Sequence, residues 1–296
     1  MNNKILFIHI PKTAGTSFRI AACKYFGDNN TFYDYGINSI ETSKDILKYI
    51  YKQNNPYCLL QEFRSYEKLF LSGHFHVGKY MHLFDTLNVI TFVRDPIEQV
   101  ISHYKHHCKD LGYRDDFISF IKDKRFKNLQ SRLLKAKPLE LYGFIGLTEE
   151  YSKSIEMINY YYDIDLEILK INTNTNNQLN SDKLDKKIIE LIQKENSEDI
   201  KLYQRAKELF LQRVKCFDKK ENYQYLWIQD KQKYSIRGVS FVRGDTPASI
   251  TISLEGKYKT LVANSFRPGL LHHRVPRDGF VGFEYIDKNN REITLV

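Results

Sequence analysis

The sequence predicts an α/β protein with a central parallel sheet flanked by helices, followed by a small antiparallel β-sandwich. Two segments, 5–26 and 88–104, each pass from an apolar run through a short turn into a stretch with helical spacing, a pattern typical of parallel α/β folds. Near residue 230 the pattern changes to short alternating runs separated by turn residues. We therefore expect one domain of residues 1–228 and a smaller one of residues 229–296.

The first of these segments predicts a binding site for an anion. Residues 5–9 are apolar enough for a buried strand, residues 11–17 form a turn rich in small residues, and residues 18–26 continue as a helix. Such a turn leaves backbone N–H groups unpaired at the positive end of the helix dipole, where negative charge is favoured. Lys12 adds a full positive charge. Further donors are the hydroxyl groups of Thr13, Thr16 and Ser17.

The second segment predicts another charged turn at the end of a buried strand. Arg94 follows the apolar run 88–93 at the carboxyl end of the strand, where ligands bind in open α/β sheets. Asp95 is placed to cap the next helix, and Pro96 suits its first turn. Ser102 follows Arg94 by eight residues, about two helical turns. An arginine suits phosphate here because its planar fork binds two oxygens at once.

Segments further along the chain predict more strands and helices. Residues 143–151 indicate a strand and then a turn capped by Thr148, with acidic residues in the first helical turn. Residues 172–177, a run of Asn and Thr, are expected to form a flexible loop, and residues 199–210 have the spacing of an amphipathic helix. The alternating runs that predict the sandwich are 235–242, 248–254, 258–264 and 279–285.

Composition and charge narrow the class of protein. The formal net charge of +9 is spread along the chain, and no nucleic-acid-binding module appears, so we expect anionic substrates and no nucleic-acid partner. The four cysteines are far apart and lack metal-ligand spacing, which predicts reduced thiols and no metal site. The first residues resemble neither a signal peptide nor a membrane anchor, so we expect a cytoplasmic protein without stable membrane insertion. The sequence does not indicate an oligomeric state.

The anion-binding turn differs from the phosphate loop of nucleoside triphosphatases. That loop places its lysine after the second glycine and directly before Ser or Thr, whereas Lys12 precedes Gly15. The turn instead resembles the Pro-Lys-Thr-Gly-Gly-Thr-Ser loop with which carbohydrate sulfotransferases bind the 5′-phosphosulfate of 3′-phosphoadenosine 5′-phosphosulfate (PAPS). This chain matches that loop with Pro11, Lys12, Thr13, Ala14, Gly15, Thr16 and Ser17, so that Ala14 replaces one glycine.

A second resemblance to the same family lies in the Arg94 segment. Its Arg-Asp-Pro sequence, with Ser102 on the following helix, is similar to the family's site for the 3′-phosphate, and the resemblance implies that Arg94 and Ser102 contact that phosphate. Gln99 departs from the pattern, since family members often carry Arg there. Residues 128–133 resemble the family's Asn-x-Gln-x-Arg element. Together these motifs imply a P-loop-like sulfotransferase fold and PAPS as the sulfuryl donor.

The resemblance also implies which residues are catalytic. In relatives of the heparan sulfate and uronyl 2-O-sulfotransferases, a Gly-His pair supplies the base, which places this role on His74, with His76 as a neighbour. An imidazole suits the task because its pKa is close to neutral pH. Glu41 and Glu62 are alternative bases, because other branches of the superfamily use a Glu upstream of the 3′-phosphate segment. Lys12 is expected to stabilise the charge on the leaving oxygen.

The carboxyl-terminal part resembles an accessory β-domain found beside bacterial glycan-modifying enzymes. The resemblance rests on segments 266–270 and 278–283, with Gly269 where that domain usually has Asp. Such a domain could hold a glycan, a partner or a second subunit, or could simply pack against the catalytic domain. His272, His273 and Arg274 are expected to form a solvated turn rather than a metal site.

These resemblances imply a PAPS-dependent sulfotransferase that acts on a carbohydrate hydroxyl of a bacterial surface or capsular glycan, without a metal. Three alternatives are a nucleotide kinase or triphosphatase with a degenerate phosphate loop, a non-catalytic glycan-binding protein, and a sulfotransferase for a non-sugar hydroxyl such as that of tyrosine or a small metabolite. The kinase is disfavoured because the chain lacks a Gly-Lys-Ser/Thr sequence. The non-catalytic glycan-binding protein is disfavoured because the chain has Lys12, Arg94 and Ser102 of the family motifs.

Overall fold

A computed structural model describes residues 3–169 and 184–296 of the chain. Its larger part is a five-stranded parallel sheet in the order β2-β3-β1-β4-β5, which confirms the predicted central sheet. From β1 the chain first builds one side of the sheet and then the other, so β1 with its neighbours β3 and β4 forms the topological switch point. The strands are β1 (Asn3–Ile8), β2 (Thr31–Asp34), β3 (Lys68–Gly73), β4 (Val89–Val93) and β5 (Phe144–Leu147).

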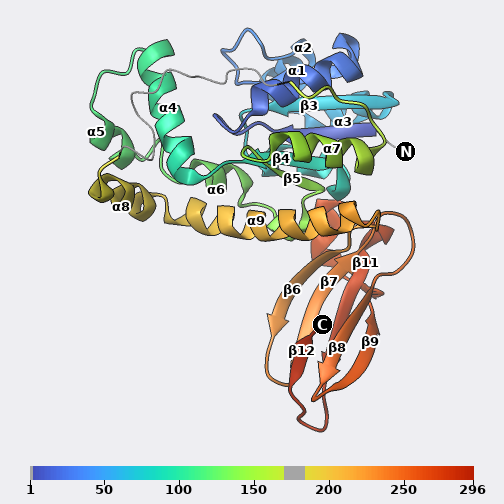
Figure 1. Cartoon of the computed structure of the whole chain (residues 1–296). Coiled ribbons are helices and arrows are strands. Elements are labelled where there is room, and N and C mark those ends of the chain that lie inside the picture. The colour runs from blue at the N-terminus through green and yellow to red at the C-terminus, as the bar shows by residue number, and fades with distance from the viewer. Residues whose placement is uncertain (1–2, 170–183) are drawn as a thin grey trace.

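Helices lie around this sheet, as Figure 1 shows. The helix after β1 is held against the sheet by Phe18, whose ring lies 4.5 Å from that of Phe7 and 5.3 Å from that of Phe92. All three rings are fully buried, so the start of this helix has a fixed position. The helices are α1 (Gly15–Phe26), α2 (Lys44–Ile46), α3 (Pro56–Arg64), α4 (Pro96–Asp110), α5 (Phe117–Lys122), α6 (Leu129–Leu134), α7 (Tyr151–Tyr162), α8 (Lys186–Glu195) and α9 (Ser197–Asp218).

The carboxyl-terminal part consists of two antiparallel sheets that pack face to face, as the alternating runs predict. One has the order β10-β11-β7-β6 and the other β12-β8-β9, with apolar residues such as Ile236, Ile252 and Phe283 between them. The border expected between residues 228 and 229 falls inside the first of these strands. The strands are β6 (Tyr225–Lys231), β7 (Ser235–Phe241), β8 (Ser249–Leu254), β9 (Lys257–Val262), β10 (Ser265–Phe266), β11 (Phe280–Ile286) and β12 (Ile293–Leu295).

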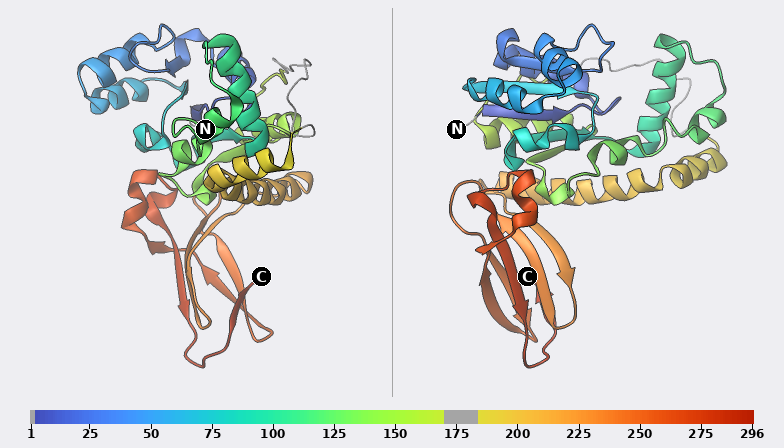
Figure 2. Two further views of the ribbon diagram at one scale, coloured as in Figure 1. Left: turned by 90° about the vertical axis from the view of Figure 1, so that its left-hand side faces the viewer. Right: turned by 180° about the vertical axis from the view of Figure 1, so that it is seen from behind.

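The sandwich packs against one end of the parallel sheet. The Tyr225 hydroxyl donates a hydrogen bond of 2.8 Å to the carbonyl of Gly143, which directly precedes β5. The backbone N–H of Thr86, shortly before β4, donates to the carbonyl of Arg274. Both contacts lie at the amino ends of strands, so the sandwich is at the opposite end from their carboxyl ends. The views in Figures 1 and 2 agree, since α4 and α5 lie far from the sandwich.

Two local predictions are wrong. Thr148 does not cap α7, because its hydroxyl donates instead to the carbonyl of Val93 at the end of β4, and the helix begins later, at Tyr151. His273 is not in a solvated turn: its side chain is buried against the α/β domain, while the neighbouring His272 is exposed. The predicted loop at residues 172–177 lies outside the described residues. Among the residues that are described, no helix has both the length and the apolar character needed to cross a membrane.

Candidate active site

Three segments predicted to carry function meet at the carboxyl edge of the parallel sheet. The turn with Lys12 follows β1, His74 follows β3, and Arg94 follows β4. Because β3, β1 and β4 are adjacent and parallel, these three segments lie side by side at the switch point. This is the position at which open α/β sheets bind their ligands.

The turn before α1 has the backbone of an anion-binding loop. Lys12 and Ala14 both adopt the left-handed conformation, with φ of 68° and 63°. Glycine is favoured in this conformation, which explains why the resembling motif has glycine where this chain has Ala14. Within the part of the chain that the structure describes, the cap residue of α1, Ala14, makes no side-chain hydrogen bond to the helix. Ala14 itself has no polar side chain that could compete with an anion at the positive end of the helix.

Thr13 and Gly15 hold this turn in shape. The Thr13 hydroxyl is buried and donates a 2.9 Å hydrogen bond to the carbonyl of Ile10, so what Thr13 offers to a ligand is its backbone N–H. A Cβ atom on Gly15 would lie 2.0 Å from Cδ2 of His9, closer than any real contact. Only glycine therefore lets the helix start directly above the His9 ring. Thr16 is half-buried in the first turn of α1, and the Ser17 side chain is buried below it.

The two predicted phosphate segments are bonded directly to each other. Arg94 Nη1 donates to the carbonyl of Lys12 at 3.3 Å, and Gln99 Nε2 donates to the carbonyl of Pro11 at 3.1 Å. Gln99, where the resembling family often has Arg, is thus a buried tie between α4 and the turn. Burial, and next the positive charge of Arg94, lower the pKa of Lys12. Two cations held this close would be stabilised by a bound anion.

Gln130 fixes Arg94 from the other side. Its side chain is fully buried; its Oε1 accepts the backbone N–H of Arg94 at 3.0 Å, and its Nε2 donates to the carbonyl of Arg94 at 2.9 Å. The buried carboxylate of Asp199 in turn accepts the backbone N–H groups of Gln130 and Ser131. The element predicted at residues 128–133 thus positions the arginine through its backbone.

Of the two residues expected at the 3′-phosphate, Ser102 lies on helix α4, and Arg94 lies two residues before the helix begins. The Asp95 carboxylate caps it, as predicted, by accepting the N–H groups of Ile97 and Glu98 at 2.9 and 3.2 Å. Ser102 is half-buried on this helix. The Arg94 guanidinium is also 3.5 Å from the Glu98 carboxylate, so an acidic group adjoins the site.

His74 has the geometry of a general base. Its Nδ1 lies 2.6 Å from the carbonyl oxygen of His9, which can only accept a hydrogen bond, so Nδ1 carries the proton and Nε2 is the basic nitrogen. The residue is exposed, and its ring packs beside the rings of His9 and Tyr35, at 4.5 and 4.8 Å between centroids. Burial is the main cause that lowers the pKa of His74, so the imidazole is neutral at pH 7.

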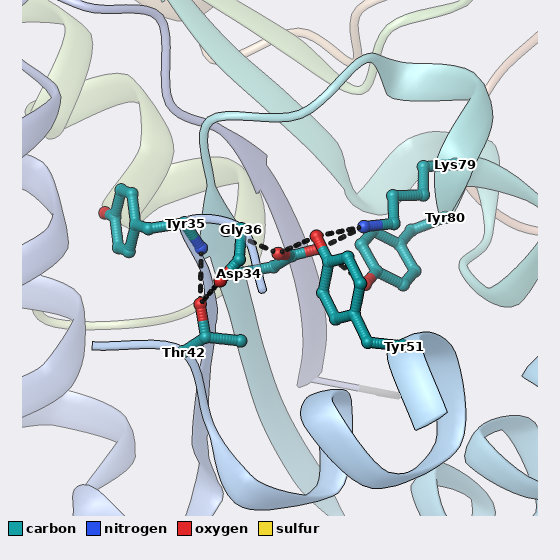
Figure 3. A network of polar contacts seen from close by, with 7 residues as sticks. All are labelled: Asp34, Tyr35, Gly36, Thr42, Tyr51, Lys79 and Tyr80. Carbon is teal, nitrogen blue, oxygen red and sulfur yellow. Dashed lines mark hydrogen bonds and ion pairs between the residues drawn. The ribbon is translucent and has the colours of Figure 1, made fainter. Parts of the chain in front are cut away.

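A network around the buried Asp34 carboxylate, drawn in Figure 3, holds the loop beside His74. The Asp34 carboxylate at the end of β2 accepts hydrogen bonds from Lys79, from the Tyr51 hydroxyl at 2.8 Å and from the Tyr80 hydroxyl at 2.7 Å. Burial alone would raise the pKa of Asp34, but these donors lower it. The carbonyl of Asp34 also accepts the backbone N–H of His74 at 3.1 Å. The network therefore joins β2 to the candidate base.

The Thr42 hydroxyl holds both ends of the turn that follows β2. Thr42 Oγ1 accepts the backbone N–H of Tyr35 at 3.0 Å and donates to the carbonyl of Gly36 at 2.7 Å. Figure 3 shows Tyr35 pointing away from the Asp34 carboxylate. The Tyr35 hydroxyl lies 2.9 Å from Nδ1 of the buried His9. His9 and Tyr35 are thus supporting residues that no local sequence motif indicates.

The other residues considered as bases have different surroundings. Glu41 is exposed and forms a 2.9 Å ion pair with Arg19. Glu62 lies near the opposite edge of the sheet, because Lys4 at the start of β1 donates to the carbonyl of the adjacent Phe63. His76 is half-buried, and its Nδ1 accepts a hydrogen bond from the backbone N–H of Gly78. Among the sequence candidates, His74 is thus the one whose Nδ1 faces a backbone carbonyl, which makes its Nε2 the basic nitrogen.

Fold and site together define an α/β protein in which the Lys12 turn, the Arg94 segment and the His74 imidazole meet at one switch point. Residues 1–204 match the Sulfotransferase family, and the chain belongs to that family. Its activity is therefore, in general terms, sulfuryl transfer to an acceptor. No curated protein matches the chain.

Proposed function

We propose that this protein transfers the sulfuryl group of PAPS to a hydroxyl of a carbohydrate acceptor. The observation that carries the proposal is the direct hydrogen bond from Arg94 to the carbonyl of Lys12, which couples two cationic segments at one switch point. A nucleotide with phosphate groups at both its 5′ and its 3′ end would engage both segments at once. A nucleoside triphosphate would present its charge at the 5′ end alone.

Each segment has a distinct binding role in this proposal. The N–H groups of residues 11–17 and the amino end of α1 bind the 5′-phosphosulfate. Arg94 and Ser102 bind the 3′-phosphate, with the arginine held in place by Gln130 and the turn held by Gln99. The nucleotide is thereby fixed in one register before the acceptor arrives.

His74 and Lys12 carry the chemical step. Nε2 of His74 accepts the proton of the acceptor hydroxyl while the acceptor oxygen forms its bond to sulfur. The bond from sulfur to the bridging phosphate oxygen breaks, and the electron pair stays with the 5′-phosphate. The Lys12 ammonium stabilises the charge that grows on this oxygen, a contribution of about 3 kcal/mol for one preorganised donor. Sulfated acceptor and 3′-phosphoadenosine 5′-phosphate (PAP) leave, and His74 returns its proton to water.

The proposal also includes the kind of acceptor and the cellular compartment in which it is sulfated. The sandwich resembles a domain that accompanies bacterial glycan-modifying enzymes, which supports a bacterial surface or capsular glycan, sulfated in the cytoplasm. The sandwich lies at the amino ends of β4 and β5, so it would act on a partner or on a distant part of a long glycan rather than on the reacting hydroxyl.

Nucleotide binding gives the first test. We expect calorimetry to show tight binding of PAP and weak binding of ATP, and Arg94→Ala to weaken PAP binding at least tenfold, since a charge-assisted phosphate contact is lost. Lys12→Ala should lower the single-turnover rate of sulfuryl transfer by about 10²–10³. Equal affinity for PAP and ATP, or a Lys12→Ala variant with a nearly normal rate, would contradict the proposal.

The base has its own test. His74→Ala should reduce the single-turnover rate by about 10²–10⁴ and leave the affinity for PAP unchanged, because the imidazole acts on the acceptor and not on the nucleotide. His272→Ala, which removes an exposed imidazole on the other domain, is the matched control. A rate loss in His74→Ala that follows a loss of PAP affinity would instead make His74 a binding residue.

A further inference from the structure

A cavity of about 570 Å³ lies beside α1, outside the residues assigned to the nucleotide. This volume falls in the range of protein sites for small ligands. Its walls come from the face of α1 beyond the anion-binding turn and from β2 with the loop that follows it. The polar side chains that line it are Arg19, Cys23, Lys24, Asp28, Tyr33 and Glu41.

The cavity is linked to the candidate base through Arg19, which lines it, and the Tyr35 ring, which does not. The Arg19 guanidinium lies over the Tyr33 and Tyr35 rings, 5.2 and 5.4 Å from their centroids. The Tyr35 ring in turn stands edge-on to the ring of His74, with 4.8 Å between centroids. The charges of Arg19 and Glu41 both act on the pKa of His74. The Tyr35 ring would therefore separate a molecule in this cavity from the base.

The charges in the cavity are balanced. Two cationic and two acidic side chains line it, so the lining has no net charge, although the whole chain carries +9. Arg19 is paired with Glu41 at 2.9 Å. Lys24 is paired at 2.8 Å with Glu167, which comes from outside the lining. The cavity therefore offers no uncompensated positive charge.

This mixture of groups matches hydroxyl groups better than anions. Arg and Lys can only donate hydrogen bonds, and ionised Asp and Glu can only accept them. A sugar hydroxyl does both, so neighbouring hydroxyls can satisfy Arg19 and Glu41 at the same time. A carboxylate or sulfate substituent only accepts, and it would stand beside the like charges of Glu41 and Asp28.

We infer that this cavity binds uncharged sugar residues next to the acceptor hydroxyl, so that the acceptor is a neutral glycan and not a polyanionic uronate chain. The inference rests on the proposed function and adds the substrate class to it. The positive charge of the rest of the chain then attracts the anionic nucleotide. Arg19, Tyr33 and Glu41 are the specificity-determining residues.

The test compares two sets of purified oligosaccharides as acceptors for labelled PAPS. One set contains neutral gluco-, galacto- and manno-configured tetrasaccharides, and the other contains tetrasaccharides with alternating glucuronate. We expect transfer to a member of the neutral set, with a KM that changes less than about twofold between low and moderate NaCl concentrations, because no charge pair with the protein is screened. Transfer to the uronate set should be at least tenfold less efficient in kcat/KM.

Removing one charge of the cavity should change the KM values of the two acceptor sets in opposite directions. Glu41→Gln should raise the KM of the neutral acceptor by about fivefold, since a charged hydrogen-bond acceptor is lost, and lower the KM of the uronate set, since Arg19 is freed. Glu190→Gln removes a similarly exposed ion-paired carboxylate on α8 and should change neither KM. A Glu41→Gln variant with a reduced kcat and an unchanged KM would overturn the inference.

Binding of PAP, measured on the same samples, separates this inference from the proposed function. If the wild-type protein binds PAP and sulfates uronate acceptors better than neutral ones, or accepts no neutral oligosaccharide, the neutral-glycan inference is wrong and the nucleotide assignment stands. If it does not bind PAP, the proposed function itself fails.

Discussion

The tautomer of His74 depends on one backbone carbonyl. Because the His9 oxygen accepts the Nδ1 proton at 2.6 Å, the basic lone pair is confined to Nε2, and the ring needs no carboxylate partner to orient it. A carboxylate would raise the pKa of the ring, whereas burial lowers it here. The imidazole is therefore already in its proton-accepting form at neutral pH.

The pH dependence of kcat/KM tests this arrangement. We expect the rate to fall on the acid side with an apparent pKa below 6.5, because a lowered pKa keeps His74 neutral until the solution is more acidic. It should fall on the alkaline side with an apparent pKa below 10.5, as Lys12 loses its proton. The acid limb should disappear in His74→Ala, measured on its residual rate. An acid limb that persists unchanged in that variant would assign the base to another group.

Amide side chains join the elements that carry the site. Gln99 connects α4 to the turn after β1, and Gln130 connects α6 to the segment after β4. An amide can accept and donate at once, so Gln130 satisfies both backbone groups of Arg94. The position of the arginine thus depends on a helix that starts 35 residues later in the chain.

Replacement of Gln130 should act through Arg94. Gln130→Met keeps the volume but leaves the N–H and carbonyl of Arg94 unpaired, so we expect the Kd for PAP to rise about tenfold. In an Arg94→Ala background the same substitution should have almost no further effect on the Kd, because the residue it positions is absent. Calorimetry on the four proteins of this double-mutant cycle measures the coupling. Additive effects of the two substitutions would show that Gln130 acts independently of Arg94.

The sequence predicts those parts of the site that are built from neighbouring residues. The turn at 11–17 and Arg94 stand out because a strand, a turn and a helix follow one another within about twenty residues. The element at 128–133 singles out Gln130, but not its bond to Arg94, which lies 36 residues away. Asp34 carries no signal, since its partner Lys79 lies 45 residues away. A buried polar residue of this kind looks like any surface polar residue until the fold is known.

The same limit applies to whole elements. Strands β7, β8 and β11 alternate in hydrophobicity and are predicted, whereas β6 begins with four apolar residues and ends with three polar ones, so it has no strand period. His273 is polar by sequence, but the contact between the two domains buries it. Burial by a distant domain has no local signal.

At the scale of the whole molecule, the contact between the domains encloses two basic groups. Lys137, 2% exposed, donates from its ammonium to Thr86 Oγ1 in the α/β domain, and its charge acts on His273 of the other domain. Within the described residues, Nδ1 of His273 has no hydrogen-bond partner. Burial lowers the pKa of Lys137 to about 7 and that of His273 to about 3. A positive charge on either group therefore does not stabilise the contact between the domains.

Protonation of Lys137 therefore sets a pH dependence of stability. Between about pH 7 and 10.5 the unfolded chain binds this proton and the folded protein does not, so the free energy of unfolding rises with pH across that window. Lys137→Met should raise this free energy at pH 7 by about 2–4 kcal/mol and remove the slope. Thr86 tolerates the change because its hydroxyl still donates to the carbonyl of Leu141.

Denaturation by urea at several pH values between 6 and 10 measures the difference. Lys135→Met, which replaces an exposed lysine two residues earlier, is the matched control and should leave both the stability and its slope unchanged. The gain from Lys137→Met should shrink toward pH 10, because the free-energy cost of removing this proton on folding falls as the pH approaches 10.5. A loss of stability in Lys137→Met at pH 7 would mean that the ammonium is paired within the contact, and that the lysine helps to join the two domains instead of opposing their association.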